Sequence, residues 1–371
     1  MSDVQSAWTA LRDTSEAIPA LAGQLGALPP EQVAVIVFFC SPAHDGLRLS
    51  AGLKASFPSS LVVGCTTAGE FSQRGAGQGG VAALALGRGL VSKAAASLVE
   101  LPRGGSDDAL AQALSRAGDE LAAGLGARTL AEVDPARHVG LVLLDGLSER
   151  EEAINFGLGS LCPMLPFVGG SASDDLLFKE TRLFVGDRTT DAGCALLVLQ
   201  TTRAFQVVRT TSFQATGAPM VVTSADPARR LVLTLDGKPA AQVYAERLGT
   251  TSDQLRKHFR AHPLGQVIGD QVWTRSPRQA LPDGSLRFYC QVPEGCDCTS
   301  STRATSSPTP TPPSQRRVAR WARSRAACCS SASSASRSST SAATRARRPG
   351  ARPRASRQPA STRMARATSP T

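Results

Sequence analysis

Compact apolar runs and Ala/Leu-rich stretches alternate over the first 200 residues. Continuous Val, Leu and Ile runs bounded by Gly or Pro are typical of strands that are covered on both faces. Such runs occupy 33–40 (VAVIVFFC), 61–65 (LVVGC), 81–86 (VAALAL) and 138–145 (HVGLVLLD). Residues 3–24 and 107–126 predict helices, the second preceded by the capping residue Ser106. A helical stretch at 46–57 between two strands predicts a β-α-β unit.

The pattern changes from about residue 181, where short apolar runs are separated by Gly, Asp or Pro turns. Few helical stretches lie between these runs, so the pattern predicts an antiparallel sheet. The runs lie at 181–186, 194–200, 204–213, 220–224 and 231–235. A helix is predicted over 238–249, closed by Gly249, and one more strand over 285–295. We place the boundary between two α/β units near 200–217.

These patterns predict an α/β protein: two α/β units with mixed sheets flanked by helices, followed by a disordered Arg/Ser/Pro-rich tail. The expected organisation is an N-terminal helical segment over 1–29, a first domain over 30–205, a partial second domain over 206–295 and the tail over 296–371. The tail contains no Leu, Ile, Phe or Tyr. Such a composition cannot form a hydrophobic core.

The formal net charge of +11 would suggest a nucleic-acid or anionic-membrane partner if it were spread over the chain. It is not, because residues 296–371 hold 15 Arg, no Lys, one Asp and no Glu. The preceding 295 residues hold 26 Lys and Arg against 29 Asp and Glu, a net charge of −3. Residues 1–295, the body of the chain, are near neutral and have no excess of Lys and Arg to bind phosphate groups, so we expect neither a nucleic-acid nor a membrane partner.

The cysteines and the apolar runs favour a cytoplasmic protein. The start of the chain is not a secretory signal, and no apolar run approaches the ~18–20 residues that span a bilayer. The body's five cysteines are scattered and odd in number, which fits reduced, buried thiols better than a disulfide framework. They are Cys40, Cys65, Cys162, Cys194 and Cys290.

Four stretches together resemble the FIST family. They are FPSSLVVGCTTAGEF (57–71), LPFVGGSASDD (165–175), GAPMVVTSADPARRLVLTLDGKPAAQVYAERLG (217–249) and HPLGQVIGD (262–270). Their order and spacing are similar to those of a FIST N-terminal domain followed by a truncated FIST C-terminal domain. The resemblance implies a sensory module for signal transduction that binds small ligands such as amino acids and acts on a signalling partner. It implies no catalytic activity, metal or cofactor.

Two polar turns are candidate ligand contacts. In GCTTAGEF, glycines permit a tight turn and close approach of a ligand, hydroxyls can donate or accept, and Glu70 could pair with an ammonium group. In VGGSASDD, two glycines expose backbone N–H groups beside a hydroxyl and two carboxylates. The predicted ligand-binding residues are Gly64, Cys65, Thr66, Thr67, Gly69, Glu70, Gly169, Gly170, Ser171, Asp174 and Asp175. Each turn is equally well explained as a loop that satisfies its own hydrogen bonds.

Two other functional classes are alternatives. Cys65 could serve a thiol or acyl-transfer enzyme, but none of the four histidines can be placed beside it from the sequence, and a buried thiol is the simpler interpretation. No Gly-x-Ser-x-Gly, His-Glu-x-x-His or Cys-x-x-Cys motif is present. A nucleic-acid binder would depend wholly on the basic tail.

The tail itself has the character of a frameshift product. Cys296 and Cys298 form the best metal-binding pattern in the chain, yet they stand where the composition changes. When the codons of Ala327–Ser331 are read one base out, with TCN serines, four apolar codons follow for every choice of degenerate base. The same shift allows an aromatic-Gly-Glu string over 360–371, similar to the end of FIST C-terminal domains. We therefore expect a frameshift at about Gly295–Cys296; a genuine basic arm is the alternative.

Overall fold

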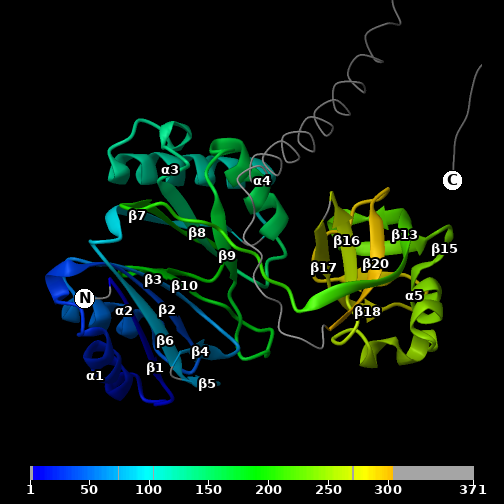
Figure 1. Ribbon diagram of the computed structural model, residues 1–371, viewed down its shortest axis with the longest axis horizontal. Helices are drawn as coiled ribbons and strands as arrows, with labels where there is room; N and C mark the ends of the chain where they lie inside the picture. Colours follow the sequence, from blue (N-terminus) through cyan, green and yellow to red (C-terminus); the bar gives the residue numbers. More distant parts are fainter. Residues whose placement is uncertain (1–2, 74, 103, 270, 304–371) are drawn as a thin grey trace, which may run out of the picture. The chain divides into compact units, whose positions relative to one another are not determined.

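The computed structural model describes residues 3–73, 75–102, 104–269 and 271–303 (Figure 1). The first sheet has the order β1-β6-β2-β3-β10-β11, and only β2 and β3 are parallel in it. Its strands are β1 Val4–Thr9, β2 Val33–Cys40, β3 Leu61–Thr66, β6 Val81–Gly87, β10 Leu183–Val185 and β11 Arg188–Thr190. A hairpin of β4 (Glu70–Ser72) and β5 (Gly75–Gly77) follows β3.

The second sheet has the order β7-β12-β8-β9, with β8 and β9 parallel. Its strands are β7 Val91–Glu100, β12 Gly193–Thr201, β8 His138–Leu144 and β9 Phe167–Ser171. The helices of this part are α1 Thr14–Leu25, α2 Gly46–Ser56, α3 Asp107–Leu125 and α4 Glu151–Leu161, with 3-10 turns η1 (Pro30–Gln32) and η2 (Leu130–Glu132).

The two sheets pack face to face between two helical layers. Val37, Val63, Leu143 and Leu197 meet in a buried cluster between the sheets. Side chains on the opposite face of the first sheet pack against α1 and α2. Side chains on the opposite face of the second sheet pack against α3 and α4. Both faces of the central strands are therefore buried, which explains their continuous apolar runs. The predicted α/β class with helix-flanked mixed sheets is confirmed.

The two sheets repeat one topology. The element order β1-α1-β2-α2-β3-β6 has the same pairing pattern as β7-α3-β8-α4-β9-β12. The last parallel pair is Cys40 with Thr66 in the first half and Leu144 with Ser171 in the second. This register makes residue 40 equivalent to 144, and 66 equivalent to 171.

Loop contacts support the same equivalence. The N–H of Ser41 donates to the carbonyl of Gly80 at 3.0 Å, and the N–H of Asp145 donates to that of Gly193 at 3.0 Å. A Cβ added to Gly80 would lie 2.3 Å from the carbonyl oxygen of Thr9, in the neighbouring strand β1. A Cβ added to Gly193 would lie 2.0 Å from that of Val99, in the neighbouring strand β7. Matching contacts at matching positions indicate an internal repeat.

A further sheet of eight strands follows, in the order β17-β16-β20-β13-β14-β19-β18 with β15 beside β14. Its strands are β13 Phe213–Asp226, β14 Leu231–Leu235, β15 Lys238–Pro239, β16 Leu264–Ile268, β17 Gln271–Arg275, β18 Pro277–Ala280, β19 Leu286–Phe288 and β20 Asp297–Arg303. Helix α5 (Ala240–Leu248) packs on it through the buried Tyr244, and 3-10 turns η3 (Pro227–Arg229) and η4 (Ser252–Lys257) complete this part.

Three expectations differ from the structure. The run at 204–213, expected to be a strand, forms none before Phe213, because β12 ends at Thr201 and β13 begins at Phe213. Residues Val4–Thr9 are strand β1 and not helix, because they pair along their whole length with β6; α1 begins only after its N-cap Asp13. The tail was expected to be disordered from residue 296, but Asp297–Arg303 forms strand β20 between β13 and β16. The rest of the predicted tail lies outside the described residues. In the part of the chain described here, no helix is long and apolar enough to cross a membrane.

Candidate functional site

The two predicted polar turns meet at the carboxyl ends of the parallel strands. The N–H of Ser173 donates to the carbonyl of Thr66 at 3.0 Å, and the N–H of Asp175 donates to that of Thr67 at 3.2 Å. Thr66 also exchanges two hydrogen bonds with the backbone of Arg182, just before β10. The loop after β9 therefore lies on the turn after β3, although the two are far apart in the sequence.

The Asp174 carboxylate holds this loop in a strained conformation. It accepts the N–H groups of Phe178 at 2.8 Å, Lys179 at 2.5 Å and Glu180 at 3.0 Å. Burial would raise the pKa of Asp174, but these backbone hydrogen bonds outweigh burial and lower it. Three non-glycine residues of the loop have positive φ: Asp175 (54°), Leu176 (64°) and Phe178 (56°). Such strain persists only where surrounding contacts impose it, and it is frequent at binding sites.

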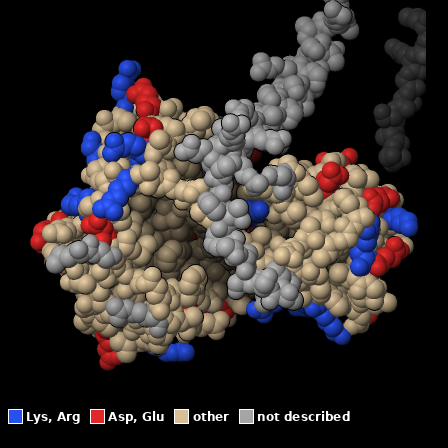
Figure 2. Space-filling view, viewed as in Figure 1, with Lys and Arg blue, Asp and Glu red and all other residues tan. Residues whose placement is uncertain are grey.

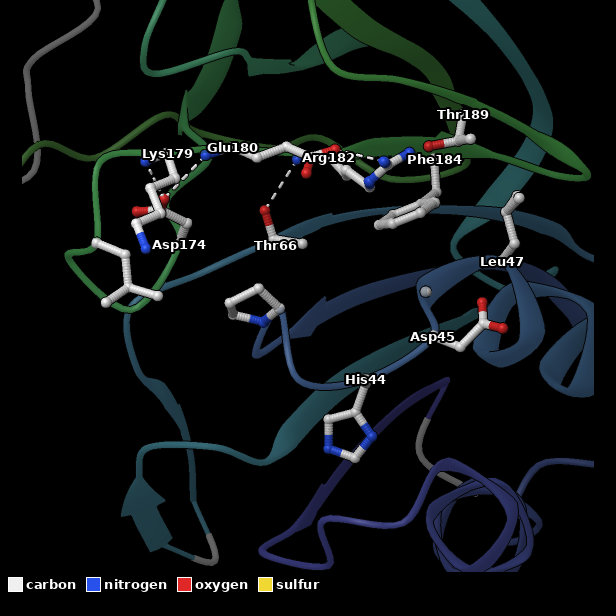
Figure 3. Close-up of a pocket in the computed structure, with 13 residues that line it drawn as sticks. His44, Asp45, Leu47, Thr66, Asp174, Lys179, Glu180, Arg182, Phe184 and Thr189 are labelled. Atoms are coloured by element: carbon white, nitrogen blue, oxygen red, sulfur yellow. Dashed lines mark hydrogen bonds and ion pairs between the residues drawn. The ribbon is translucent and has the colours of Figure 1, made fainter.

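A cavity of about 350 Å³ opens beneath the loop (Figure 3). Thr66 and Asp174 from the two predicted turns line it. The other lining residues are Pro42, His44, Asp45, Gly46, Leu47, Leu177, Lys179, Glu180, Arg182, Phe184 and Thr189. The cavity lies at the carboxyl ends of β2 and β3, where ligands usually bind in helix-flanked parallel sheets.

Charges of both signs line the cavity; two of them are exposed and have no ion-pair partner among the described residues, although Asp45 accepts the N–H of Arg48 at 3.0 Å. Arg182 forms an ion pair with Glu180. Lys179 and Asp45 form no ion pair with any residue that the structure describes. Figure 3 shows Lys179 beside Asp174 at one end and Asp45 at the other, with Thr66 and Phe184 between them.

Two buried polar atoms of the lining lack hydrogen-bond partners among the described residues. They are His44 Nε2 and Thr189 Oγ1. The other ring nitrogen of His44 lies 3.2 Å from the hydroxyl of Thr14, at the start of α1. Because buried polar groups are nearly always hydrogen-bonded, orphaned atoms beside a cavity fit a site that binds a polar molecule.

Glu70 does not face the cavity as the sequence suggested. One carboxylate oxygen accepts the hydroxyl of Thr67 at 2.6 Å, and the other accepts the N–H of Gly80 at 3.1 Å. The side chain is buried, at 3% exposure. Glu70 and Thr67 therefore lock the β3–β4 turn, and neither lines the cavity.

Two of the four predicted glycines serve packing. A Cβ on Gly64 would lie 2.5 Å from the ring of Phe38, and one on Gly169 would lie 1.7 Å from the carbonyl oxygen of Val142. Gly69 has a positive φ of 155°, and Gly170 has open space. None of the four lines the cavity.

Two further predicted residues have partners away from the cavity. Ser171 donates its hydroxyl to Glu151 at 3.3 Å, at the start of α4. Asp175 accepts the hydroxyl of Ser41 at 2.7 Å, and its other carboxylate oxygen is buried without a partner among the described residues. Both contacts fix the loop that carries Asp174.

Cys65 is unsuited to nucleophilic chemistry. It is 3% exposed in the cluster between the sheets, and this burial raises the pKa of its thiol to about 12. A thiolate nucleophile needs a depressed pKa and access to solvent. The alternative of a thiol enzyme therefore gains no support from the structure.

Metal and nucleic-acid sites gain no support either. Within the described ranges, no three or more His, Cys, Asp and Glu side chains gather as metal ligands. On the face drawn in Figure 2, Lys and Arg alternate with Asp and Glu over the described residues. The basic tail beyond Arg303 lies outside those residues.

Of the thirteen residues that line the cavity, the sequence predicted only Thr66 and Asp174. Asp45 caps α2. The other lining residues include Phe184 in strand β10, which pairs with β3, and Lys179 and Arg182 in the loop before β10. Only Asp45 left a signal, as a capping residue before the predicted helix at 46–57. The pairing of β10 with β3 has no local signature.

Sequence models of two known domains match this chain. A sequence model of the FIST N domain matches residues 34–238, and one of the FIST C domain matches residues 240–343. The first match covers more than half of the chain, and the second continues beyond the described residues. A search of curated proteins finds no match. The chain therefore belongs to the FIST family, as the four sequence stretches indicated.

Proposed function

We propose that this protein is a small-ligand sensor whose ligand is an amino acid bound in the cavity between β3 and the 174–182 loop. FIST domains are associated with sensory signal transduction and small-ligand binding. The observation that carries the proposal is the pair of uncompensated charges, Lys179 and Asp45, at the two ends of one cavity. Ligand pockets typically combine an apolar lining with a few such polar groups.

The lining matches the parts of an amino acid. The ammonium of Lys179 supports binding of a carboxylate. The exposed carboxylate of Asp45 supports binding of an ammonium group. Leu47 and Phe184 offer apolar contacts to a side chain. Because Lys179 and Asp45 lie at opposite ends of the cavity, an amino acid would pair with both only if one of the two charges is on its side chain.

The loop offers a route from the cavity to a signalling partner. Ser171 contacts Glu151, and Arg230 at the β13–β14 turn pairs with Glu151 at 2.5 Å and with Glu152 at 2.7 Å. Arg230 is only 5% exposed, so this ion cluster is firmly held. Occupancy of the cavity would reach the eight-stranded sheet that contains β13 and β14 through these contacts. A cytoplasmic location is proposed with it, since the five body cysteines are free thiols.

Isothermal titration of the full chain with a panel of L-amino acids tests the proposal. We expect one or a few to bind, and saturation at a hundredfold excess over Kd to stabilise the fold by about 2.7 kcal/mol. Lys179→Met and Asp45→Asn should each weaken binding about tenfold or more. Lys238→Met, an exposed lysine on β15, is the matched control and should bind as wild type. Unchanged affinity in Lys179→Met would rule out the proposed carboxylate contact.

We infer that the chain departs from its selected reading frame near Cys296. The central strand β20 buries three hydroxyl residues in succession, Thr299 (3% exposed), Ser300 (8%) and Ser301 (1%). Central strands normally bury apolar side chains. With TCN serine codons, reading one base out gives an apolar residue at the positions of Ser300 and Ser301 for every choice of degenerate base, and Tyr or His at that of Thr299. Resequencing the gene and its transcript tests this; tail peptides detected in cells by mass spectrometry, encoded by an unbroken frame, would contradict it.

A further inference from the structure

The cavity between β3 and the 174–182 loop has an excess of negative charge on its walls. With His44 neutral, three carboxylates and two cationic groups of the described residues line it, so the formal net charge is −1. These charged residues are Asp45, Asp174, Glu180, Lys179 and Arg182. Burial alone would raise the pKa of Asp174, but its backbone hydrogen bonds lower it, so this carboxylate is ionised at neutral pH. A ligand that balances the lining therefore carries a net positive charge.

Asp45 supplies the negative charge at its end of the cavity. Its carboxylate accepts the N–H of Arg48 as the cap of α2, but it forms no ion pair with a cation in the described ranges. The Arg48 side chain does not line the cavity. Nor do the residues that flank the single positions outside the described ranges, which are Gln73, Gly75, Pro102, Gly104, Gly269 and Gln271. A cationic group of the ligand can therefore serve as the partner of Asp45.

A buried acceptor adjoins Asp45. The Thr14 hydroxyl accepts the N–H of Asp45 at 3.2 Å, and it can also accept a proton on Nδ1 of His44, at 3.2 Å. Neutral His44 with its proton on Nδ1 presents a lone pair on Nε2. His44 is 5% exposed, lines the cavity, and has no partner for Nε2 among the residues that the structure describes. The Asp45 carboxylate and the His44 ring thus offer acceptors for one ammonium group.

The opposite end of the cavity offers groups of both signs. Lys179 lies there beside Asp174 (Figure 3). The ammonium of Lys179 favours a carboxylate, and the field of the ionised Asp174 favours an ammonium group next to that carboxylate. This end therefore matches the α-carboxylate and α-ammonium groups of an amino acid. Phe184 lies between the two ends, and Leu47 lies near Asp45, so an aliphatic side chain would find apolar contact on its way to Asp45 (Figure 3).

We propose that the ligand is a basic amino acid, such as L-lysine or L-ornithine, whose α-carboxylate binds Lys179 and whose side-chain ammonium binds Asp45. This inference rests on the proposed amino-acid function and names the ligand class. A basic amino acid has a net positive charge that complements the lining. An acidic amino acid could also span the cavity, but it would bring a net negative charge to walls that are already negative.

Titration calorimetry of the full chain with L-lysine, L-norleucine and L-glutamate tests the ligand class. L-Norleucine keeps the α groups and the carbon chain of L-lysine but lacks the side-chain ammonium. We expect L-lysine to bind at least about tenfold more tightly than L-norleucine, which corresponds to one hydrogen bond to a charged group. L-Glutamate should bind more weakly than either.

Two variants separate the two ends of the ligand. Asp45→Asn keeps a capping side chain for α2 but removes the charge, so the preference for L-lysine over L-norleucine should disappear. Lys179→Met should weaken the binding of both ligands by a similar factor and leave the preference unchanged. Asp119→Asn, on the exposed face of α3, is the matched control and should bind as wild type.

Three results would overturn the inference: equal affinity for L-lysine and L-norleucine, a preference for L-glutamate, or a preference for L-lysine that survives in Asp45→Asn. In each of these cases an amino acid still binds, so the amino-acid proposal stands. Binding of no amino acid at all would overturn that proposal and this inference with it.

Discussion

Replacing Asp174 by alanine should loosen the loop that covers the cavity. The carboxylate accepts three backbone N–H groups, and hydrogen bonds to a charged group contribute about 1.5–3 kcal/mol each. The lower end of that range gives a gross loss of about 4–5 kcal/mol. Release of three residues from left-handed conformations returns about 1 kcal/mol each. We therefore expect a net loss of about 2 kcal/mol in the free energy of unfolding.

Urea denaturation at neutral and acidic pH measures this effect, and hydrogen exchange locates it. Because the folded-state pKa of Asp174 is lowered, its contribution is present above the ordinary carboxyl pKa and is lost as pH falls through the folded-state value. The gap between variant and wild type should therefore close in acid. The amides of Phe178, Lys179 and Glu180 should lose protection. Asp119→Ala, on the exposed face of α3, should change stability by less than about 0.5 kcal/mol. A loss below about 0.5 kcal/mol for Asp174→Ala, with protected amides, would refute the reasoning.

Three further predictions concern packing, the ion cluster and the thiol. Gly169→Ala should cost about 3 kcal/mol or more in urea denaturation, since its Cβ would lie 1.7 Å from a carbonyl oxygen, whereas Gly170→Ala, with open space, should be nearly neutral. Arg230→Met should cost about 3–5 kcal/mol in the same assay because it leaves two glutamates without their buried partner; a loss under about 1 kcal/mol would contradict the role of the cluster. Cys65 should resist iodoacetamide at neutral pH in the folded protein and react after unfolding, as mass spectrometry of the labelled peptide would show.

The central strands of the two sheets could be predicted because each of them is apolar along its own length. The runs at 33–40 and 61–65 are apolar throughout, and the structure buries both of their faces. Strand β1 could not be found in this way. Its Val4–Thr9 mixes polar and small residues, and it becomes a strand only by pairing with β6.

The site could be predicted only in part, for a related reason. The turns that hold Thr66 and Asp174 stand out as Gly- and hydroxyl-rich exits from strands, and both residues line the cavity. Lys179 and Arg182 join them only because β10 pairs with β3, which is long-range information. The glycines of the turns suggested a ligand, but their lack of Cβ accommodates Phe38 and a strand carbonyl.

The internal repeat was also beyond sequence reasoning. At equivalent positions the two halves share the Val-Gly pair at Val63-Gly64 and Val168-Gly169 and, in β6 and β12, a pattern of Gly, Ala and Leu that begins at Gly80 and Gly193, which is too weak to mark a repeat by itself. Their equivalence appears in pairing order and register.

The most direct test of the central claim is a two-dimensional NMR titration of the full chain with the L-amino acid that binds most tightly. We expect saturable shifts at the amides of Asp45, Thr66, Lys179 and Arg182, and in Lys179→Met, which should remain folded, the same shifts should need about ten times more ligand or more. Saturable shifts confined to residues remote from this cavity, or the absence of binding by any amino acid, would contradict it.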